Sequence, residues 1–171
     1  MTLKSIFSPN FGLIMPMTKY RLLNQEELQN FEDEFVKYLV VNGIAAEDWR
    51  KMLEERPDDA QKIVDLFSDV VFEKIMREVQ FLVIYRKSYI QSIQCLKDKM
   101  IMVAISTKNE DIDMTKVDWS SLDSFDGFEI HKAEKEYTKA REEELFDLTE
   151  IGYSLSDGKI YKALMMASIN D

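Results

Sequence analysis

The stretch FLVIYRKSYIQSIQCLKDKMIMVAIS, residues 81–106, decides the fold of this chain. It contains three runs rich in β-branched and aromatic residues, at 81–86, 88–95 and 99–106. The middle run alternates apolar and polar side chains, which is typical of a strand with one face in water. Lys87-Ser88 separates the first two runs, and LKDK (96–99) is typical of a tight hairpin turn. The stretch therefore predicts an antiparallel meander of three strands.

Three helices are predicted before the meander. Asn24 with Glu27 three residues later forms a capping-box start, and Asn42-Gly43 is a stop signal, so one helix is expected between them. A short helix over about 47–55 follows, and Pro57 suits the first turn of a third helix. Helical spacing predicts the buried stripe of the third helix: Ile63, Leu66, Phe67, Val70, Val71 and Ile75.

After the meander, the sequence predicts a polar loop, a fourth strand and two C-terminal elements. Residues 107–127 predict a long loop with one helical turn near Trp119–Leu122, and residues 128–137 are a candidate fourth strand. Thr138 is expected to cap a helix that ends near Ile151. Residues 159–169 fit a last helix or a closing strand, and we favour the helix.

These elements predict one α+β domain over residues 17–171. We expect N-terminal helices packed on a small antiparallel sheet, a meander of three to four strands, with C-terminal helices completing the layer. Residues 1–16 are expected to form a flexible N-terminal extension. Their apolar part is broken by Gly12 and Pro16 and does not resemble the core of a signal peptide.

Composition excludes several classes of function. The net charge is −10, and two acidic segments (25–78 and 107–150, each −8) flank a basic one (79–106, +3). Phosphate backbones would repel such a chain, so nucleic acid is not expected as a partner. No run approaches the roughly 20 apolar residues of a membrane helix. The single cysteine, Cys95, excludes an internal disulfide, and we expect a protein of the reducing cytoplasm.

DIDMT (111–115) contains the sequence pattern with which one group of phosphotransfer enzymes presents its nucleophile and magnesium ligand. Here four residues separate Asp111 from the strand before it, and that strand belongs to a meander. We therefore expect a solvated turn in which Asp113 or Thr115 caps a backbone group. Asp111 and Asp113 remain the candidate metal ligands, but the spacing lacks the glycine and distal glutamate of a helix–loop–helix calcium site.

His131 is the only histidine, which excludes sites built from several histidines. Glu129 and His131 share one face if 128–137 is a strand, and such a pair is a candidate acid–base couple. The five glycines are never close together, so no phosphate-binding loop and no cofactor is predicted. Tyr85, Arg86, Lys87 and Tyr89 form an aromatic and basic cluster at the first hairpin, which is the candidate interaction site.

Four further stretches are distinctive: LFSDVVFEKIM (66–76), LFDLTEIGYSLSDGKIYKALM (145–165), KYRLLNQEE (19–27) and FVKYLVVNGI (35–44) followed by DW. Together they resemble a family of short acidic proteins of unknown function from Bacteroidetes bacteria. The resemblance runs from about Met17 to Ile169. It implies a small soluble cytoplasmic protein and supplies no activity, cofactor or site.

Two functions stay open at this point. The first is a cytoplasmic interaction module without catalytic activity that binds another protein or itself. The alternative is an enzyme that uses carboxylates and His131 in a cleft between helices and sheet. A pocket where carboxylates converge on His131 would favour the enzyme, whereas an exposed apolar patch would favour the module.

Overall fold

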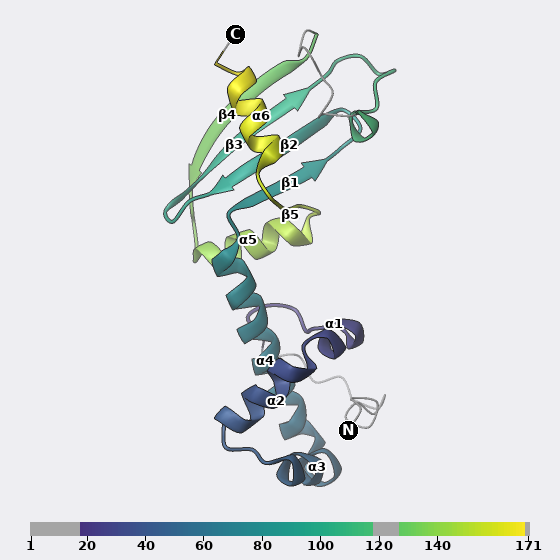
Figure 1. Ribbon diagram of the computed structural model, residues 1–171, viewed down its shortest axis with the longest axis vertical. Helices are drawn as coiled ribbons and strands as arrows, with labels where there is room; N and C mark the ends of the chain where they lie inside the picture. The colour runs from purple at the N-terminus through teal and green to yellow at the C-terminus, as the bar shows by residue number, and fades with distance from the viewer. Residues whose placement is uncertain (1–17, 118–126, 170–171) are drawn as a thin grey trace. The chain divides into compact units, whose positions relative to one another are not determined.

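The computed structural model describes residues 18–117 and 127–169 (Figure 1). The chain separates into two compact units, Met1–Lys74 and Ile75–Asp171, which we call the helical unit and the sheet unit. Helix α4 (Pro57–Glu78) contributes residues to both. The expected extension at 1–16 and the helical turn near Trp119–Leu122 lie outside the described residues. That residues 17–171 form a single domain stays a prediction.

The helical unit contains α1 (Gln25–Asn30), α2 (Glu32–Val41), α3 (Ala46–Glu55) and most of α4. The capping box at Asn24 and Glu27 is present as predicted. The single helix expected from Asn24 to Asn42 is wrong, because the chain breaks at Phe31, where φ is −104° and ψ is 23°. Three consecutive acids, residues 32–34, fill the first turn of α2, where the helix dipole favours negative charge and hence a new helix start.

An aromatic cluster forms the core of the helical unit. The Phe35 ring meets Trp49 of α3 edge-on, with centroids 5.3 Å apart, and meets Phe67 of α4 at 5.0 Å. Tyr38, one turn along α2, also contacts Phe67 at 5.4 Å. Such tilted and edge-to-face pairs add to the stabilisation that burial of the rings provides.

The buried face of α4 in the helical unit differs from the predicted stripe. Phe67 and Val71 are buried as expected, but Leu66 and Val70 are more than half exposed. Val64, Ser68 and Phe72 are buried in their place. The reason lies in residues 19–23, which bind to α4: Ser68 Oγ accepts the Leu23 N–H, and Asp69 accepts the N–H groups of Lys19 and Tyr20. This added layer moves the buried arc away from Leu66 and Val70.

The sheet unit is built on five antiparallel strands in the order β4-β3-β2-β1-β5. The meander consists of β1 (Phe81–Tyr85), β2 (Tyr89–Cys95), β3 (Lys99–Ser106) and β4 (Glu129–Glu136), so the candidate fourth strand is confirmed. A 3-10 turn, η2 (Met114–Lys116), lies between β3 and β4. The sequence missed β5 (Ser154–Ser156), which is only three residues long and pairs with β1. The α+β class is confirmed.

Two C-terminal helices contact the sheet. Helix α6 (Lys159–Ala167) lies across one face, where Tyr161 and Leu164 pack on the side chains of three strands: Val83, Ile90, Val103 and Ile105 (Figure 1). Helix α5 (Arg141–Glu150) is joined to the opposite face, where Glu144 of α5 pairs with Lys135 of β4. The choice of a helix over a strand at residues 159–169 is therefore confirmed. Whether the N-terminal helices also pack on the sheet stays a prediction.

The start of α5 is a further correction. The helix begins at Arg141 after Ala140, so Thr138 does not cap it. Instead the Thr138 N–H and hydroxyl both donate to the Glu144 carboxylate, which is buried within the first turns of α5. Burial alone would raise the pKa of Glu144, but the hydrogen bonds from Lys135 and Thr138 outweigh it and hold that pKa below its usual value.

Candidate functional site

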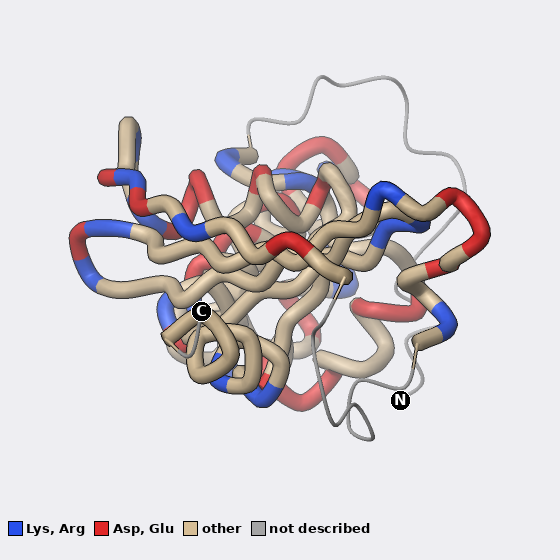
Figure 2. The backbone as a smooth tube through the Cα atoms, turned by 90° about the horizontal axis from the view of Figure 1, so that it is seen from above, with Lys and Arg blue, Asp and Glu red and all other residues tan. Residues whose placement is uncertain are grey.

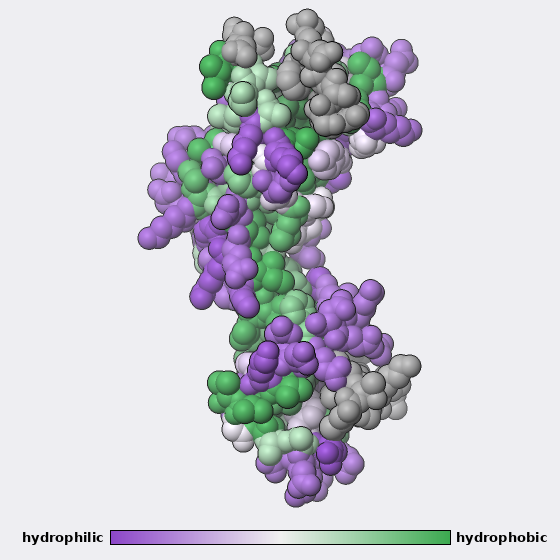
Figure 3. All heavy atoms as spheres, in the orientation of Figure 1, coloured by the Kyte–Doolittle hydropathy of each residue, from purple (hydrophilic) through white to green (hydrophobic). Residues whose placement is uncertain are grey.

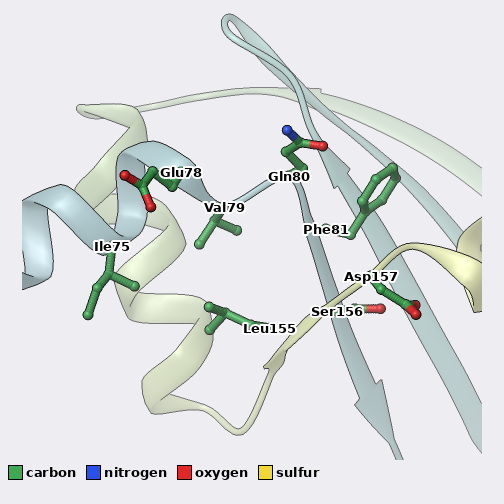
Figure 4. A pocket seen from close by; sticks show the side chains of 8 residues that line it. All are labelled: Ile75, Glu78, Val79, Gln80, Phe81, Leu155, Ser156 and Asp157. Atoms are coloured by element: carbon green, nitrogen blue, oxygen red, sulfur yellow. The ribbon is translucent and has the colours of Figure 1, made fainter.

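A cleft of about 430 Å³ opens at one edge of the sheet unit, beside the end of α4 and the pairing of β1 with β5 (Figure 4). Its apolar lining comes from α4, β1 and β5: Ile75, Val79, Phe81 and Leu155. Its polar lining comes from the same elements: Glu78, Gln80, Ser156 and Asp157. Volumes of this size and a mixed lining are usual for sites that bind small ligands or a single side chain.

A glycine shapes the β5 side of the cleft. Gly158 has φ of +78°, and a Cβ at this position would lie 2.6 Å from Phe81 Cδ2, so only glycine fits this turn. The Ser156 hydroxyl accepts the Gly158 N–H, and the Asp157 carboxylate accepts the Lys159 N–H at 3.0 Å. These bonds hold the turn after β5, and β5 itself pairs with β1.

Arg141 holds the α4 side of the cleft. Its guanidinium donates to four backbone carbonyls from two parts of the sheet unit, at 2.6–3.1 Å: Met76 and Val79 at and just after the end of α4, and Cys95 and Leu96 at and just after the end of β2. The planar fork of arginine suits several acceptors at once, which a lysine would not. The end of α4 and the turn between β2 and β3 are therefore tied to the start of α5.

Cys95, beside this junction, is a structural residue. Burial raises the pKa of its thiol to about 11, although the positive charge of Arg141 acts in the opposite direction. At neutral pH the thiol is protonated, so it lacks the thiolate that nucleophilic or metal-binding cysteines use.

The two carboxylates of the cleft differ in their surroundings. Asp157 forms an ion pair of 2.7 Å with Lys159, and the hydrogen bond from Lys159 lowers the pKa of Asp157. Lys162 lies nearby, with its Nζ 6.0 Å from the centre of the Phe81 ring. Glu78 is the last residue of α4, and no cation of the described residues pairs with it. The cleft therefore has one neutralised carboxylate and one free carboxylate.

The candidate acid–base pair lies elsewhere, on the edge strand β4. His131 Nε2 is 3.6 Å from Glu129 Oε2, so the structure brings the two side chains together as predicted. The histidine side chain is 64% exposed and the glutamate 47%, and neither lines the cleft. Lys108 also pairs with Glu129 at 2.5 Å and, through that hydrogen bond, lowers the glutamate's pKa. In open solvent such pairs interact weakly, and nothing excludes water from them.

The acids of DIDMT lie in a solvated turn. Asp113 Oδ1 accepts the Thr115 N–H at 3.1 Å and the Thr115 hydroxyl at 2.6 Å, so the predicted backbone cap is confirmed. The Asp111 N–H bonds to the side chain of Asn109. Within residues 18–117 and 127–169, no group of three or more potential ligands is arranged to hold a metal ion.

The aromatic and basic cluster at the first hairpin is partly used by the fold. Arg86 donates to the Ile151 carbonyl at 3.0 Å, which places a positive charge at the C-terminal end of α5. The Lys87 carbonyl accepts the Met114 N–H. Tyr85 is 42% exposed, whereas Tyr89 is half-buried. Arg86 thus forms a contact within the fold. Tyr85 is the more exposed of the two aromatic rings in the cluster.

A comparison with protein-family models identifies the family. A family of unknown function, DUF6495, matches residues 15–168. The chain belongs to this family. Searches of curated proteins and of solved structures found no match. The predicted resemblance to a family of unknown function is confirmed, and the DUF6495 match begins two residues before Met17.

The region matched by DUF6495 includes a second surface of interest, on the helical unit. Five large apolar side chains are at least half exposed on two helices that are packed together: Val36, Val40 and Val41 of α2, and Leu66 and Val70 of α4. Figure 3 shows hydrophobic atoms over both helices on the face in view. We call these five residues the helical apolar surface.

Acidic and basic residues both occur along residues 18–117 and 127–169, as Figure 2 shows. Residues 18–74 hold fourteen acids and eight bases, a net charge of −6. Among the described residues, no helix combines the length and apolar character needed to cross a membrane.

Sequence reasoning missed both the cleft and the helical apolar surface. Glu78 and Leu155 are 77 positions apart, and only the pairing of β5 with β1 brings them to one cleft. The only sequence pattern that could have indicated β5 is an apolar residue, Leu155, between Ser154 and Ser156, directly before the turn residues Asp157-Gly158. The spacing of Leu66 and Val70 predicts a buried stripe, so it gives no sign of their exposure.

Proposed function

We propose that the chain is a small bacterial protein of the cytoplasm that works as an interaction module without catalytic activity. The observation that carries this proposal is the helical apolar surface. Val41 is 84% exposed and Val40 is 68% exposed, although both are among the most hydrophobic side chains. Groups of exposed apolar residues bordered by charge are typical of protein-binding surfaces.

The position of these residues supports a role in binding. Leu66 precedes Phe67 on α4, and Val70 follows it by one turn. On α2, Val36 lies between Phe35 and Tyr38, and Val41 follows Tyr38 by three residues. Phe67 is the residue at which α2 and α4 meet. The apolar surface therefore continues outward from a rigid aromatic core, which keeps its side chains in fixed positions and limits the entropy lost on binding.

We favour another protein over a second copy as the partner. The net charge of −6 on residues 18–74 would repel the same surface of a second copy, whereas a basic partner would be attracted. The alternative of an enzyme has less support, because Glu129 and His131 lie exposed on the edge strand β4 and do not line the cleft beside α4 and β5.

The test is quantitative affinity purification of the tagged full chain from its native cell. A triple variant, Val40→Ser, Leu66→Ser and Val70→Ser, changes three exposed side chains of the helical apolar surface. The matched control is Ile151→Ser, Met166→Ser and Ile169→Ser, which changes three apolar side chains of the sheet unit that are also more than half exposed.

We expect one partner that is retained by the wild type and by the control and is lost from the surface variant. The absence of a reproducible partner, or equal retention by all three proteins, would contradict the proposal.

A further inference from the structure

We infer that the cleft between the end of α4 and β5 binds a single aliphatic ammonium group, the chemistry of a lysine side chain or a small primary amine. This inference does not depend on the proposed function, because it concerns a different surface. It rests on three features of the cleft: an apolar wall, one free carboxylate and one carboxylate that is already neutralised.

The apolar wall fits a chain of methylene groups. In Figure 4, Leu155 reaches from β5 toward Ile75 and Val79 of the opposite side, so three aliphatic side chains face one space. Leu155 is 57% exposed, although the residue that it opposes on β1, Leu82, is fully buried. A methylene chain placed against these residues would remove apolar surface from water, which favours binding.

Glu78 supplies the charge at the end of this wall. Its carboxylate lies beside Ile75 on the helix side of the cleft (Figure 4), and no cation of the described residues pairs with it. Glu78 is also the last residue of α4, where the negative end of the helix dipole disfavours an anion. A bound cation at this position would offset both the unpaired charge and its unfavourable place on the helix.

Asp157 limits the ligand to one positive charge. This carboxylate lies at the other end of the cleft, beyond Phe81 (Figure 4), and it is paired with Lys159 at 2.7 Å. A second ammonium group would have to displace Lys159 and would meet Lys162 beside Phe81. The cleft is thus suited to a monoamine and gives no advantage to a diamine.

The test is an NMR titration of the ¹⁵N-labelled full chain with pentylammonium chloride. 1-Pentanol has a similar apolar body without the charge, cadaverine adds a second charge, and Nα-acetyl-lysine methylamide presents a lysine side chain. We expect saturable shifts in the amides of residues 78–81 and 154–157 with pentylammonium. 1-Pentanol should bind more weakly than pentylammonium. Cadaverine, which carries two ammonium groups, should not bind more tightly than pentylammonium once its affinity is divided by the number of its ammonium groups.

Two variants separate the contributions. Glu78→Gln should weaken pentylammonium binding about two- to fivefold, as expected for loss of an exposed ion pair, and should leave pentanol unchanged. It removes an anion from a helix C-terminus, so the melting temperature should not fall. Leu155→Ser should weaken both ligands.

Binding of the lysine derivative would assign the site to a protein side chain, and binding of pentylammonium alone would assign it to free amines. Both results support the inference. Absence of saturable shifts at the cleft, equal binding of amine and alcohol, or full affinity in Glu78→Gln would overturn it.

Discussion

In the helical unit, valine and leucine side chains that flank the aromatic contact between α2 and α4 face solvent. In the sheet unit, by contrast, charged side chains reach inward to satisfy the backbone: Arg141 binds four carbonyls, and buried Glu144 holds Lys135 and Thr138. Exposed apolar side chains occur in both units, but in the helical unit five of them lie on α2 and α4, two helices that contact each other. We infer that the buried polar side chains of the sheet unit stabilise its fold and that the exposed apolar side chains of α2 and α4 recognise a partner.

The largest effect on stability is expected from the aromatic core. Phe35→Ala should lower the free energy of unfolding by about 3–5 kcal/mol, because it leaves a cavity between Trp49 and Phe67. Val36→Ala, the adjacent exposed position, should cost about 0.5 kcal/mol or less. Urea unfolding followed by circular dichroism measures both. Similar losses for the two variants would remove the distinction between core and surface in this unit.

A slightly smaller loss is expected at the polar junction of the sheet unit. Arg141→Ala should cost about 3 kcal/mol, because it leaves several carbonyls without their donor. Arg141→Lys should recover only part of this, since an ammonium group does not match the planar arrangement. Lys132→Ala, on the exposed part of β4, is the control. If Arg141→Ala unfolds at the same urea concentration as the control, the junction does not stabilise the unit.

Glu144→Gln should cost about 1–2 kcal/mol at neutral pH, through its weakened hydrogen bonds with Lys135 and Thr138. The folded state lowers the pKa of Glu144 from its usual value of about 4.5. Its contribution is therefore complete above pH 4.5 and is lost as the pH falls through the lower folded-state pKa. Urea unfolding at several pH values should show the gap between wild type and Glu144→Gln closing in acid. A gap that stays constant down to pH 3 would contradict this assignment.

The same contrast explains which features could be predicted from the sequence. The meander and the capping box at Asn24 follow from neighbouring residues, and the structure confirms both. The role of Arg141 could not be predicted, because its acceptors lie 45–65 positions away.

The prediction of which α4 residues are buried was wrong at Leu66 and Val70 for the same physical reason, namely contacts between residues far apart in the sequence. Periodicity alone could not show that residues 19–23 would bind beside Ser68 and Asp69 and leave Leu66 and Val70 exposed. The candidate pair Glu129 and His131 was correctly placed on one strand face, but its exposure depends on β4 being an edge strand.

The smallest effect on stability is expected at the helical apolar surface. Each of Val40→Ser, Leu66→Ser and Val70→Ser should change the free energy of unfolding by about 0.5 kcal/mol or less, because these side chains are already in water. The urea unfolding curve of the triple variant measures the sum. A loss of several kcal/mol would show that these residues stabilise the helical unit, contrary to their assignment as a recognition surface.

The most direct test of the central claim is site-specific photocrosslinking in the native cell. A benzophenone amino acid would replace Val40 or Val70 on the helical apolar surface, and Met166, which is 69% exposed on α6, would serve as the control position. We predict that the same partner protein is crosslinked from positions 40 and 70 and not from position 166. No discrete adduct at positions 40 and 70, or the same adducts from all three positions, would contradict the account.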